Sequence, residues 1–284
     1  MINRLSKLFI SIIFLACYNF YIKILYVVRK QNHRKVVVLC YHEVTSKQRR
    51  RFTRQMNYLK KLVYPVAADF TKIKNGVRNA AITFDDGFQC LLENAIPELR
   101  LRKIPATIFI PSGNLGMNPG WIDNKQDKNY SESIMTSEQL KALPKDLITI
   151  GSHCVTHPNL TLIGEKKAKG ELIKSKMELE KITGTEVNIL AFPYSAYNQK
   201  IVEWAKQAGY KYMFSGQSTF SSQFLTGRIS VSPDDWPIEF RLKLLGAYQW
   251  LPFAIAIKRR LRKFLTYIMC KRKSTKDKSD KKSK

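Results

Sequence analysis

The sequence has few cysteines and few acidic residues for a chain of 284 residues. Its five cysteines, at positions 17, 40, 90, 154 and 270, lack the paired spacing of a disulfide framework, which argues against a disulfide-stabilised secreted domain. There are 22 Asp and Glu residues against 49 Lys and Arg, a net charge of +27. The apolar fraction of 44% is that of a globular protein, so the chain can bury a sizeable core.

The positive charge lies mostly at the two ends of the chain. Residues 1–35 hold seven basic residues and no acidic one, and residues 258–284 hold thirteen basic and two acidic ones. Such ends predict contact with an anionic surface, which is either a membrane or a nucleic acid. No recognisable nucleic-acid-binding motif accompanies the charge, so we expect a membrane lipid surface as partner and no nucleic acid.

An apolar segment follows the first basic residues. It begins with LFISIIFLACYNFYI at residue 8 and reaches Val28, about long enough to cross a bilayer. No clear A-x-A cleavage site follows, which favours an uncleaved anchor over a cleaved signal peptide; a buried core helix is the third alternative. We therefore predict a transmembrane or signal-anchor helix over residues 1–30.

The C-terminal segment, residues 246–284, interleaves aromatic and aliphatic residues with Lys and Arg clusters. This pattern is typical of a helix in the membrane interface followed by a Lys-rich tail, and a disordered basic tail is the alternative. Basic residues also crowd the C-terminal side of the N-terminal apolar segment, and the positive-inside rule places that side in the cytoplasm. We therefore expect a membrane-associated protein on the cytoplasmic face, with an extracytoplasmic location as the alternative.

Predicted strands and helices alternate between residues 35 and 245, which favours parallel strands in one catalytic domain. The predicted strands cover 36–42, 80–86, 106–110, 147–153, 188–194, 210–215 and 228–231, and the predicted helices 90–104, 164–184 and 197–210. Such units build a barrel or a doubly wound sheet. No Gly-rich phosphate loop follows the first strand, which argues against a nucleotide-binding sheet.

Reactive side chains close several of these predicted strands, as expected at the catalytic end of a barrel. They are His42, Asp85, Asp86, His153 and Tyr194. His157 follows His153 by four residues, and the chain has only four histidines. Two imidazoles and one carboxylate form an open ligand set for a catalytic divalent metal. Consecutive side chains diverge at a strand end, so one aspartate can bind the metal while the other takes a proton from water.

Three short motifs resemble those of the polysaccharide deacetylase family, the carbohydrate esterases with a NodB-homology domain. They are TFDDG at 83–87, HCVTH at 153–157 and FPYS at 192–195, and the resemblance covers about residues 36–240. It implies an α/β fold, a distorted (β/α) barrel with about seven strands. It also implies a metal-dependent hydrolase that removes N-acetyl groups from N-acetylhexosamine units of a polysaccharide or lipid-linked glycan. A catalytically inactive carbohydrate-binding or scaffold protein on the same fold is the alternative.

The resemblance also assigns roles to residues of the site. Asp85 would be the general base, and Asp86, His153 and His157 would hold the metal. Zn²⁺ is our first expectation for the cofactor, with Co²⁺, Ni²⁺ or Mn²⁺ as alternatives. The backbone N–H of Tyr194, after Pro193 in the third motif, would help to bind the oxyanion.

The sequence departs from the family pattern at three positions. Cys154 stands where the second motif usually has Ser or Thr, and no histidine follows His157 to act as the late general acid. The Tyr-His pair at 41–42 resembles poly-N-acetylglucosamine deacetylases that carry this histidine on the first strand, which implies His42 as the acid. The arginine that usually begins the third motif is absent, and Arg228 is the candidate to pair with the base.

A polar loop at 117–135 borders the expected site and contains Trp121. We expect Trp121, Pro193 and Tyr194 to contact the substrate.

Overall fold

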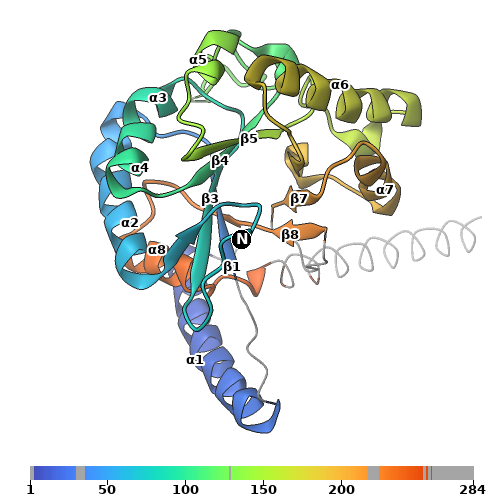
Figure 1. Cartoon of the computed structure of the whole chain (residues 1–284). Coiled ribbons are helices and arrows are strands. Elements are labelled where there is room, and N and C mark those ends of the chain that lie inside the picture. The colour runs from blue at the N-terminus through green and yellow to red at the C-terminus, as the bar shows by residue number, and fades with distance from the viewer. Residues whose placement is uncertain are drawn as a thin grey trace, which may run out of the picture. The chain divides into compact units, whose positions relative to one another are not determined.

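The computed structural model describes residues 3–29, 36–127, 129–216, 224–251, 254 and 257, with only the backbone of residues 19–29. The chain divides into two compact units, Met1–Tyr248 and Gln249–Lys284. Most of the predicted interfacial segment at 246–284 lies outside the described residues. The first unit is an α/β domain with helices around a ring of parallel strands (Figure 1).

In the described part of the chain, one sheet contains nine strands, all paired in parallel. They are β1 (Val36–Tyr41), β2 (Tyr64–Val66), β3 (Asn79–Phe84), β4 (Ala106–Ile110), β5 (Ile148–Ser152), β6 (Ile189–Ala191), β7 (Tyr212–Ser215), β8 (Leu225–Gly227) and β9 (Ile229–Ser230). The order is β8-β7-β6-β5-β4-β3-β1-β9, and β2 pairs with the first half of β3.

The described helices are α1 (Arg4–Arg29), α2 (Arg49–Leu62), α3 (Cys90–Asn94), α4 (Ile96–Arg102), α5 (Ser137–Lys141), α6 (Glu165–Thr183), α7 (Gln199–Gln207) and α8 (Pro237–Leu244).

A single residue, Arg228, connects the two edges of this sheet. It follows β8, which pairs with β7, and precedes β9, which pairs with β1. Its backbone N–H donates to Ser215 of β7 at 3.0 Å, and the N–H of Val231 donates to Cys40 of β1 at 2.9 Å. The barrel is therefore nearly closed, and the side chain of Arg228 belongs to the seam where its two edges meet.

The predicted barrel is confirmed, but the expectation of about seven strands is wrong for the described residues. The sequence analysis missed β2 and β8, which have three residues each and are too short to show strand periodicity.

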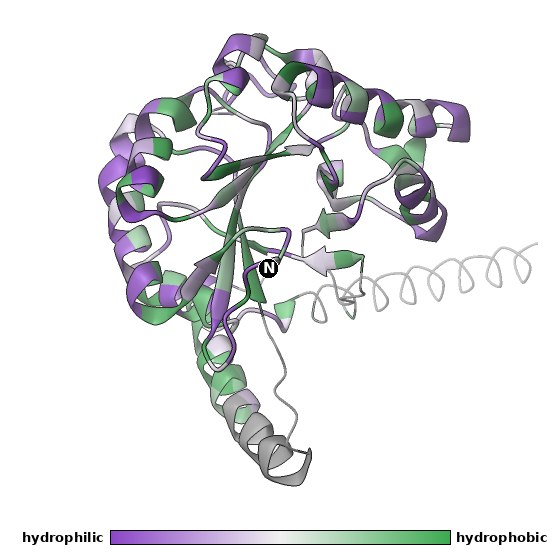
Figure 2. Ribbon diagram, viewed as in Figure 1, coloured by the Kyte–Doolittle hydropathy of each residue, from purple (hydrophilic) through white to green (hydrophobic). Residues whose placement is uncertain are grey.

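Side chains of the strands alternate between the barrel interior and the layer beneath the helices. The outer layer holds alternate residues such as Leu39 and Ile82, whereas the interior cluster holds smaller and aromatic ones, including Val38, Ala81 and Phe109. Apolar residues follow the strands, and polar residues cover the outer faces of the helices (Figure 2). Gly151 has no room for a side chain, because an added Cβ would lie 2.5 Å from the Phe109 ring.

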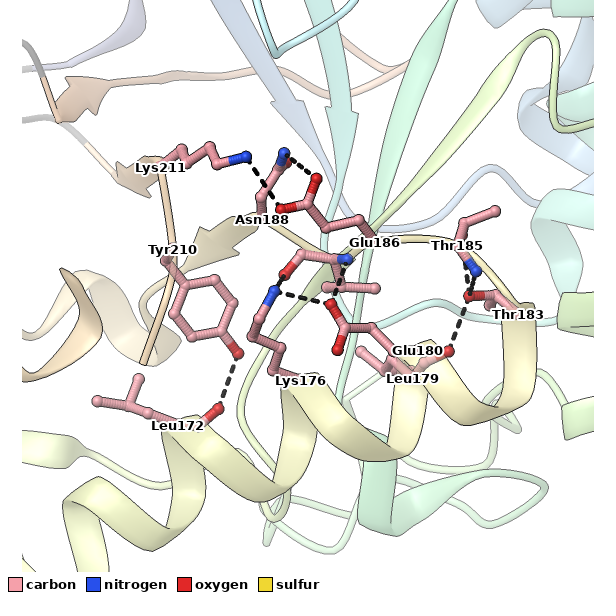
Figure 3. Close-up of polar contacts among 11 residues, drawn as sticks. Leu172, Lys176, Leu179, Glu180, Thr183, Thr185, Glu186, Asn188, Tyr210 and Lys211 are labelled. Atoms are coloured by element: carbon pink, nitrogen blue, oxygen red, sulfur yellow. Dashed lines mark hydrogen bonds and ion pairs between the residues drawn. The ribbon is translucent and has the colours of Figure 1, made fainter. Parts of the chain in front are cut away.

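Polar contacts attach the C-terminal half of α6 to the segment that leads into β6 (Figure 3). The Lys176 ammonium donates to Glu180 and to the carbonyl of Val187, both at 2.7 Å, and Glu180 also accepts the Val187 N–H at 2.9 Å. The Tyr210 hydroxyl donates to the carbonyl of Leu172 at 2.9 Å. The contacts of Val187 fix the start of β6, whose far end contributes to the site described below, and the Tyr210 bond fixes the segment before β7.

The structure divides one predicted helix into two and contains α2, α5 and α8, which were not predicted. The helix predicted over 90–104 is divided into α3 and α4 at Ala95, because Pro97 lacks the N–H that a continuous helix needs there. Helix α2 was not predicted, since its apolar stripe is narrow: Phe52, Met56 and Leu59 are its only buried apolar residues. The helix predicted over 164–184 is confirmed as α6, and Gly184 ends it with a left-handed φ of 66°.

The N-terminal apolar segment forms the long helix α1. Near its start, Arg4 pairs with Glu239 of α8 at 2.7 Å and lies 4.1 Å from the centre of the Trp236 ring. Where side chains are described, none of the helices is both long and apolar enough to span a bilayer. The predicted transmembrane anchor is therefore not supported, and the side chains of residues 19–29 lie outside the description.

Candidate active site

The first aspartate after β3, Asp85, is held in a buried ion pair. Its two carboxylate oxygens accept hydrogen bonds from both terminal nitrogens of Arg228, at 2.6 and 2.7 Å. The Arg228 side chain also donates to Thr83 at 3.3 Å, and its guanidinium lies 5.2 Å from the centre of the Phe109 ring. Because both partners are almost fully buried, the pair is shielded from solvent screening.

The ion pair keeps Asp85 ionised. Burial alone would raise the pKa of this carboxyl, but the charge and hydrogen bonds of Arg228, with a contribution from His153, lower it well below the usual range. The same pair raises the pKa of Arg228, against the effect of burial. Asp85 is therefore a fixed carboxylate that can accept a proton.

The second aspartate, Asp86, points away from Arg228 because the backbone changes direction after Asp85. Asp86 has a left-handed φ of 69°, which is uncommon for a residue with a side chain, and Gly87 follows with a φ of 65°. An added Cβ at Gly87 would lie 2.2 Å from Ile110 of β4. The glycine of the TFDDG motif thus permits a tight turn against β4, and the turn separates the two carboxylates.

Asp86 faces two imidazoles. Its Oδ1 atom lies 3.8 Å from Nε2 of His153 and 3.4 Å from Nε2 of His157. Nδ1 of His153 is 2.7 Å from the carbonyl of Ala191 at the end of β6, which directs Nε2 towards Asp86. The potential ligand atoms of Asp86, His153 and His157 all lie within 4.8 Å of one another.

The protonation of these three groups fits a bound divalent cation. Burial lowers the pKa of His153 to about 4 and of His157 to about 2, so both imidazoles are neutral and have free lone pairs at neutral pH. Burial raises the pKa of Asp86 to about 7, and its Oδ1 has no hydrogen-bond partner among the described residues. A carboxylate oxygen that is buried without a partner, and that faces two neutral imidazoles, matches the donor set of a Zn²⁺ site.

The loop between the two histidines is fixed from helix α6. The Glu171 carboxylate accepts the backbone N–H groups of Val155 and Thr156 at 2.8 and 2.9 Å, and the Thr156 hydroxyl at 2.8 Å. The loop needs this support, since Cys154 and His157 have left-handed φ values of 65° and 56°. Glu171 therefore positions both histidines without touching either.

Aromatic rings surround His157 on its exposed side. Trp121 stacks on its imidazole with 4.1 Å between ring centres, and Tyr194 meets it edge-on at 4.8 Å. Tyr194 has a φ of 55° and is 56% exposed, whereas Pro193 is buried. The predicted substrate contacts Trp121 and Tyr194 therefore border the metal-ligand set.

His42 lies on the Asp85 side of this cluster. It follows β1, is exposed, and has a ring nitrogen within 4.8 Å of an Asp85 carboxylate oxygen. The structure thus brings the predicted base, acid and metal ligands to one end of the barrel.

The sequence analysis missed two residues of this site. Cys40 lies in the barrel interior with its Sγ 3.4 Å from Oδ2 of Asp85. Its position two residues before His42 on the same strand could have identified it, because side chains two apart share a face. Nothing in the sequence distinguishes Glu171 as a functional residue, since it is one of several charged residues on an amphipathic helix.

Comparison with a family profile and with known proteins points to one protein family. The profile of the family described as polysaccharide deacetylase matches residues 72–213, half of the chain. The Bacillus subtilis protein YxkH, named as a polysaccharide deacetylase, is 23% identical over 222 residues, which cover 72% of this chain and 75% of YxkH. A Staphylococcus aureus poly-beta-1,6-N-acetyl-D-glucosamine N-deacetylase is 29% identical over 172 residues. That match covers 55% of this chain and only 56% of the staphylococcal protein.

Solved structures resemble the fold of the first unit. The structure of IcaB from Ammonifex degensii superposes with a TM-score of 0.61 at 25% identity, and covers 77% of this chain and 98% of IcaB. A polysaccharide deacetylase from Bacillus cereus gives the same TM-score at 21% identity and covers 74% of this chain. The residues that match the family profile include Asp85, Asp86, His153 and His157.

Proposed function

The chain belongs to the polysaccharide deacetylase family, and from this premise we propose that it is a metal-dependent N-deacetylase of N-acetylhexosamine glycans. One observation carries the proposal: an ionised carboxylate, Asp85, lies beside a three-ligand set of Asp86, His153 and His157. Nothing in the described residues favours the inactive alternative, because all four side chains are present and three of them, Asp86, His153 and His157, face one another.

Asp86, His153 and His157 would hold the divalent cation. When bound, the cation would polarise the acetamido carbonyl and make the attacking water more acidic. Zn²⁺ fits the ligand set best, and Co²⁺, Ni²⁺ and Mn²⁺ remain alternatives.

The protein's own groups divide the proton transfers. Asp85 accepts the proton of the attacking water, and its ion pair with Arg228 orients the carboxylate and keeps it ionised. His42, on the same side of the cluster, donates a proton to the departing sugar amine. The backbone N–H of Tyr194 contributes to binding the oxyanion, and the rings of Trp121 and Tyr194 form an apolar surface for the sugar.

Two substrates fit the proposal, and the first is a poly-N-acetylglucosamine-type glycan, which fits a domain that faces outward. The staphylococcal relative carries that substrate in its name, and the Tyr-His pair at 41–42 resembles the deacetylases that act on it. A lipid-linked N-acetylhexosamine is the alternative, and it fits better if the domain faces the cytoplasm.

The experiment is an assay of acetate release after metal has been stripped and restored. We expect no acetate from the chelator-treated protein, and release from β-1,6-linked N-acetylglucosamine oligomers once a divalent metal is added. Lipid-linked N-acetylglucosamine and β-1,4-linked oligomers distinguish the substrate alternatives. A protein that binds metal but releases no acetate from any of these substrates would contradict the proposal.

We further propose that the chain is associated with a membrane lipid surface, on its cytoplasmic face. The basic residues at both ends of the sequence support this proposal. A reporter fused after Lys284, together with thiol labelling of Cys270 in intact cells, tests which side of the membrane the protein occupies. Labelling by an impermeant external reagent would contradict a cytoplasmic location.

A further inference from the structure

A second group of potential metal ligands contains Asp85 and His42, the proposed base and acid. Cys40 lies in β1, His42 follows the end of that strand two residues later, and Asp85 follows the neighbouring strand β3. The ligand atoms of these three residues lie within 4.8 Å of one another. The group shares no residue with Asp86, His153 and His157.

We propose that Cys40, His42 and Asp85 form a second site, for a thiophilic divalent cation such as Zn²⁺, and that its occupation inhibits the enzyme. Thiolate, imidazole and carboxylate are the three ligand types that Zn²⁺ takes from proteins. With three protein ligands, water completes the tetrahedron.

The spacing of Cys40 and Asp85 suits a shared cation. Zinc takes bonds of about 2.3 Å to sulfur and about 2.1 Å to a carboxylate oxygen. Two such bonds that end on atoms 3.4 Å apart, as Cys40 Sγ and Asp85 Oδ2 are, meet at an angle of about 101°. This is close to the tetrahedral angle, so these two ligands need little movement.

The ion pair with Arg228 is compatible with the cation. Asp85 Oδ2 accepts one hydrogen bond from Arg228 and one from the Cys40 thiol. The cation would replace the thiol proton: the S–H bond breaks, the proton leaves to solvent, and a sulfur–metal bond forms. The bond from Arg228 to the same oxygen can persist, because a carboxylate oxygen has two lone pairs. The new thiolate charge offsets half of the charge of the divalent cation, since the charge of Asp85 is already paired with Arg228.

The proposed inhibition follows because two of the three ligands, Asp85 and His42, are also the proposed base and acid. It rests on the proposed function, in which Asp85 is the base and His42 the acid. A cation bound to both would occupy the Asp85 lone pair and the His42 nitrogen that proton transfer needs. Binding itself does not depend on those roles.

Titration of the full-length apoprotein with Co²⁺ tests the site directly. A thiolate bound to Co²⁺ gives an intense charge-transfer band in the near ultraviolet, which ligation by Asp86, His153 and His157 cannot give because they supply no sulfur. We expect the weak visible bands of the first site and, at higher Co²⁺, the charge-transfer band. The band should be absent in Cys40→Ser and retained in Cys154→Ser, the matched control with another buried cysteine.

Two results would overturn the site: no charge-transfer band in the wild type at saturating Co²⁺, or a band that persists in Cys40→Ser. If Cys40→Ser does not fold, His42→Gln at the exposed position provides the second variant. Loss of this ligand should weaken the Co²⁺ affinity reported by the band about tenfold or more. An unchanged affinity would contradict the role of His42.

Acetate release at increasing Zn²⁺ tests the inhibition separately. Wild-type activity should rise with the first equivalent and fall in excess Zn²⁺, whereas Cys40→Ser should retain a larger fraction of its own maximum. Equal loss in both proteins would overturn the inhibitory role. Absence of acetate release at every Zn²⁺ concentration would contradict the proposed function, while the Co²⁺ band would still report on the second site.

Discussion

Asp85 and Asp86 are neighbours in the sequence but lie in opposite electrostatic environments. Arg228 lowers the pKa of Asp85 despite its burial, whereas burial raises the pKa of Asp86 to about 7. The difference arises from the turn at Asp86 and Gly87, which directs one carboxylate to a guanidinium and the other to two neutral imidazoles. One aspartate is thus supplied with a positive charge by the protein, and the other must obtain one from a cation.

The raised pKa of Asp86 predicts a stability change in the metal-free protein. Between the unfolded pKa of about 3.9 and the folded pKa of about 7, the folded protein holds a proton that the unfolded chain has released. The contribution of Asp86 to the free energy of unfolding therefore falls as the pH rises through this window and does not recover above pH 7. The lowered pKa values of His153 and His157 contribute in the opposite direction, up to the unfolded histidine pKa of about 6.5.

Asp86→Asn removes this unfavourable ionisation. In excess chelator at pH 8, we expect the variant to be more stable than the wild type by about 2–4 kcal/mol, with the difference shrinking towards pH 4. Denaturant unfolding measured at both pH values checks this. Equal stability of the two proteins at pH 8 would show that the buried Asp86 carboxylate does not lower the free energy of unfolding.

A second residue-scale prediction concerns His42. Because the sequence has no histidine after His157, the proposed general acid is on the first strand, and His42→Ala should lower kcat by about 10²–10⁴-fold. Metal content should not change. The variant should also lose the fall in rate at high pH that a general acid produces. Comparison of the pH–rate profiles of the wild type and the variant checks this. If both rates fall in the same way at high pH, a group other than His42 donates the proton.

For individual residues, the sequence predicted which side chains lie close together but not which contacts fix their positions. Strand-end positions and motif spacing were sufficient to bring together Asp85, Asp86, His153 and His157. The contact between Arg228 and Asp85 was also expected, although 143 residues separate them. Glu171 could not be found, because its three hydrogen bonds depend on how α6 packs against the loop after β5.

Among the secondary-structure elements, α6 has the most direct influence on the metal ligands. Its Glu171 carboxylate organises the loop from Val155 to Thr156, which separates His153 from His157. Glu171→Gln keeps the size of the side chain but removes one oxygen acceptor and the negative charge. We expect the affinity for Zn²⁺ to fall about 10–100-fold, the usual effect of altering a group that supports metal ligands.

Competition with a chromophoric chelator measures this affinity without any need for turnover. Glu165→Gln is the matched control, because Glu165 lies on the same helix, is exposed, and pairs only with Lys169 among the described residues. Equal affinities in the two variants would mean that the loop keeps its shape without Glu171.

The accuracy of element prediction depended on length and burial. Buried strands with β-branched residues, such as β1 and β4, were predicted within a residue or two. The three-residue strands β2 and β8 were missed, because their partners in the barrel rather than their own sequence make them strands. Closure through Arg228 was therefore not visible in the sequence.

For the whole molecule, the proposed site residues lie between positions 40 and 228, inside the first compact unit. A chain ending after Tyr248 should therefore bind metal and release acetate from soluble oligomers like the full chain. It should bind anionic vesicles less strongly at low salt, since each Lys or Arg near such a surface contributes about 1 kcal/mol. Vesicle flotation at two salt concentrations measures this, and unchanged flotation would contradict a membrane role for the basic tail.

The family and the barrel could be predicted from the sequence because the motifs are local and occur in order. The attachment of the protein to a membrane could not be decided in this way. The apolar and basic residues of the two chain ends fit a membrane anchor or interfacial helix, and they also fit a buried helix or a solvated basic tail.

The central claim is that two adjacent aspartates divide the work, with Asp86 on the cation and Asp85 as the base. It is tested most directly by measuring bound metal and acetate release together in Asp86→Ala and Asp85→Asn at limiting Zn²⁺. We predict that Asp86→Ala loses both. Asp85→Asn should bind the first equivalent of metal and yet release no acetate, since an amide cannot accept the water's proton. Equal loss of metal in both variants, or turnover by Asp85→Asn, would contradict this division.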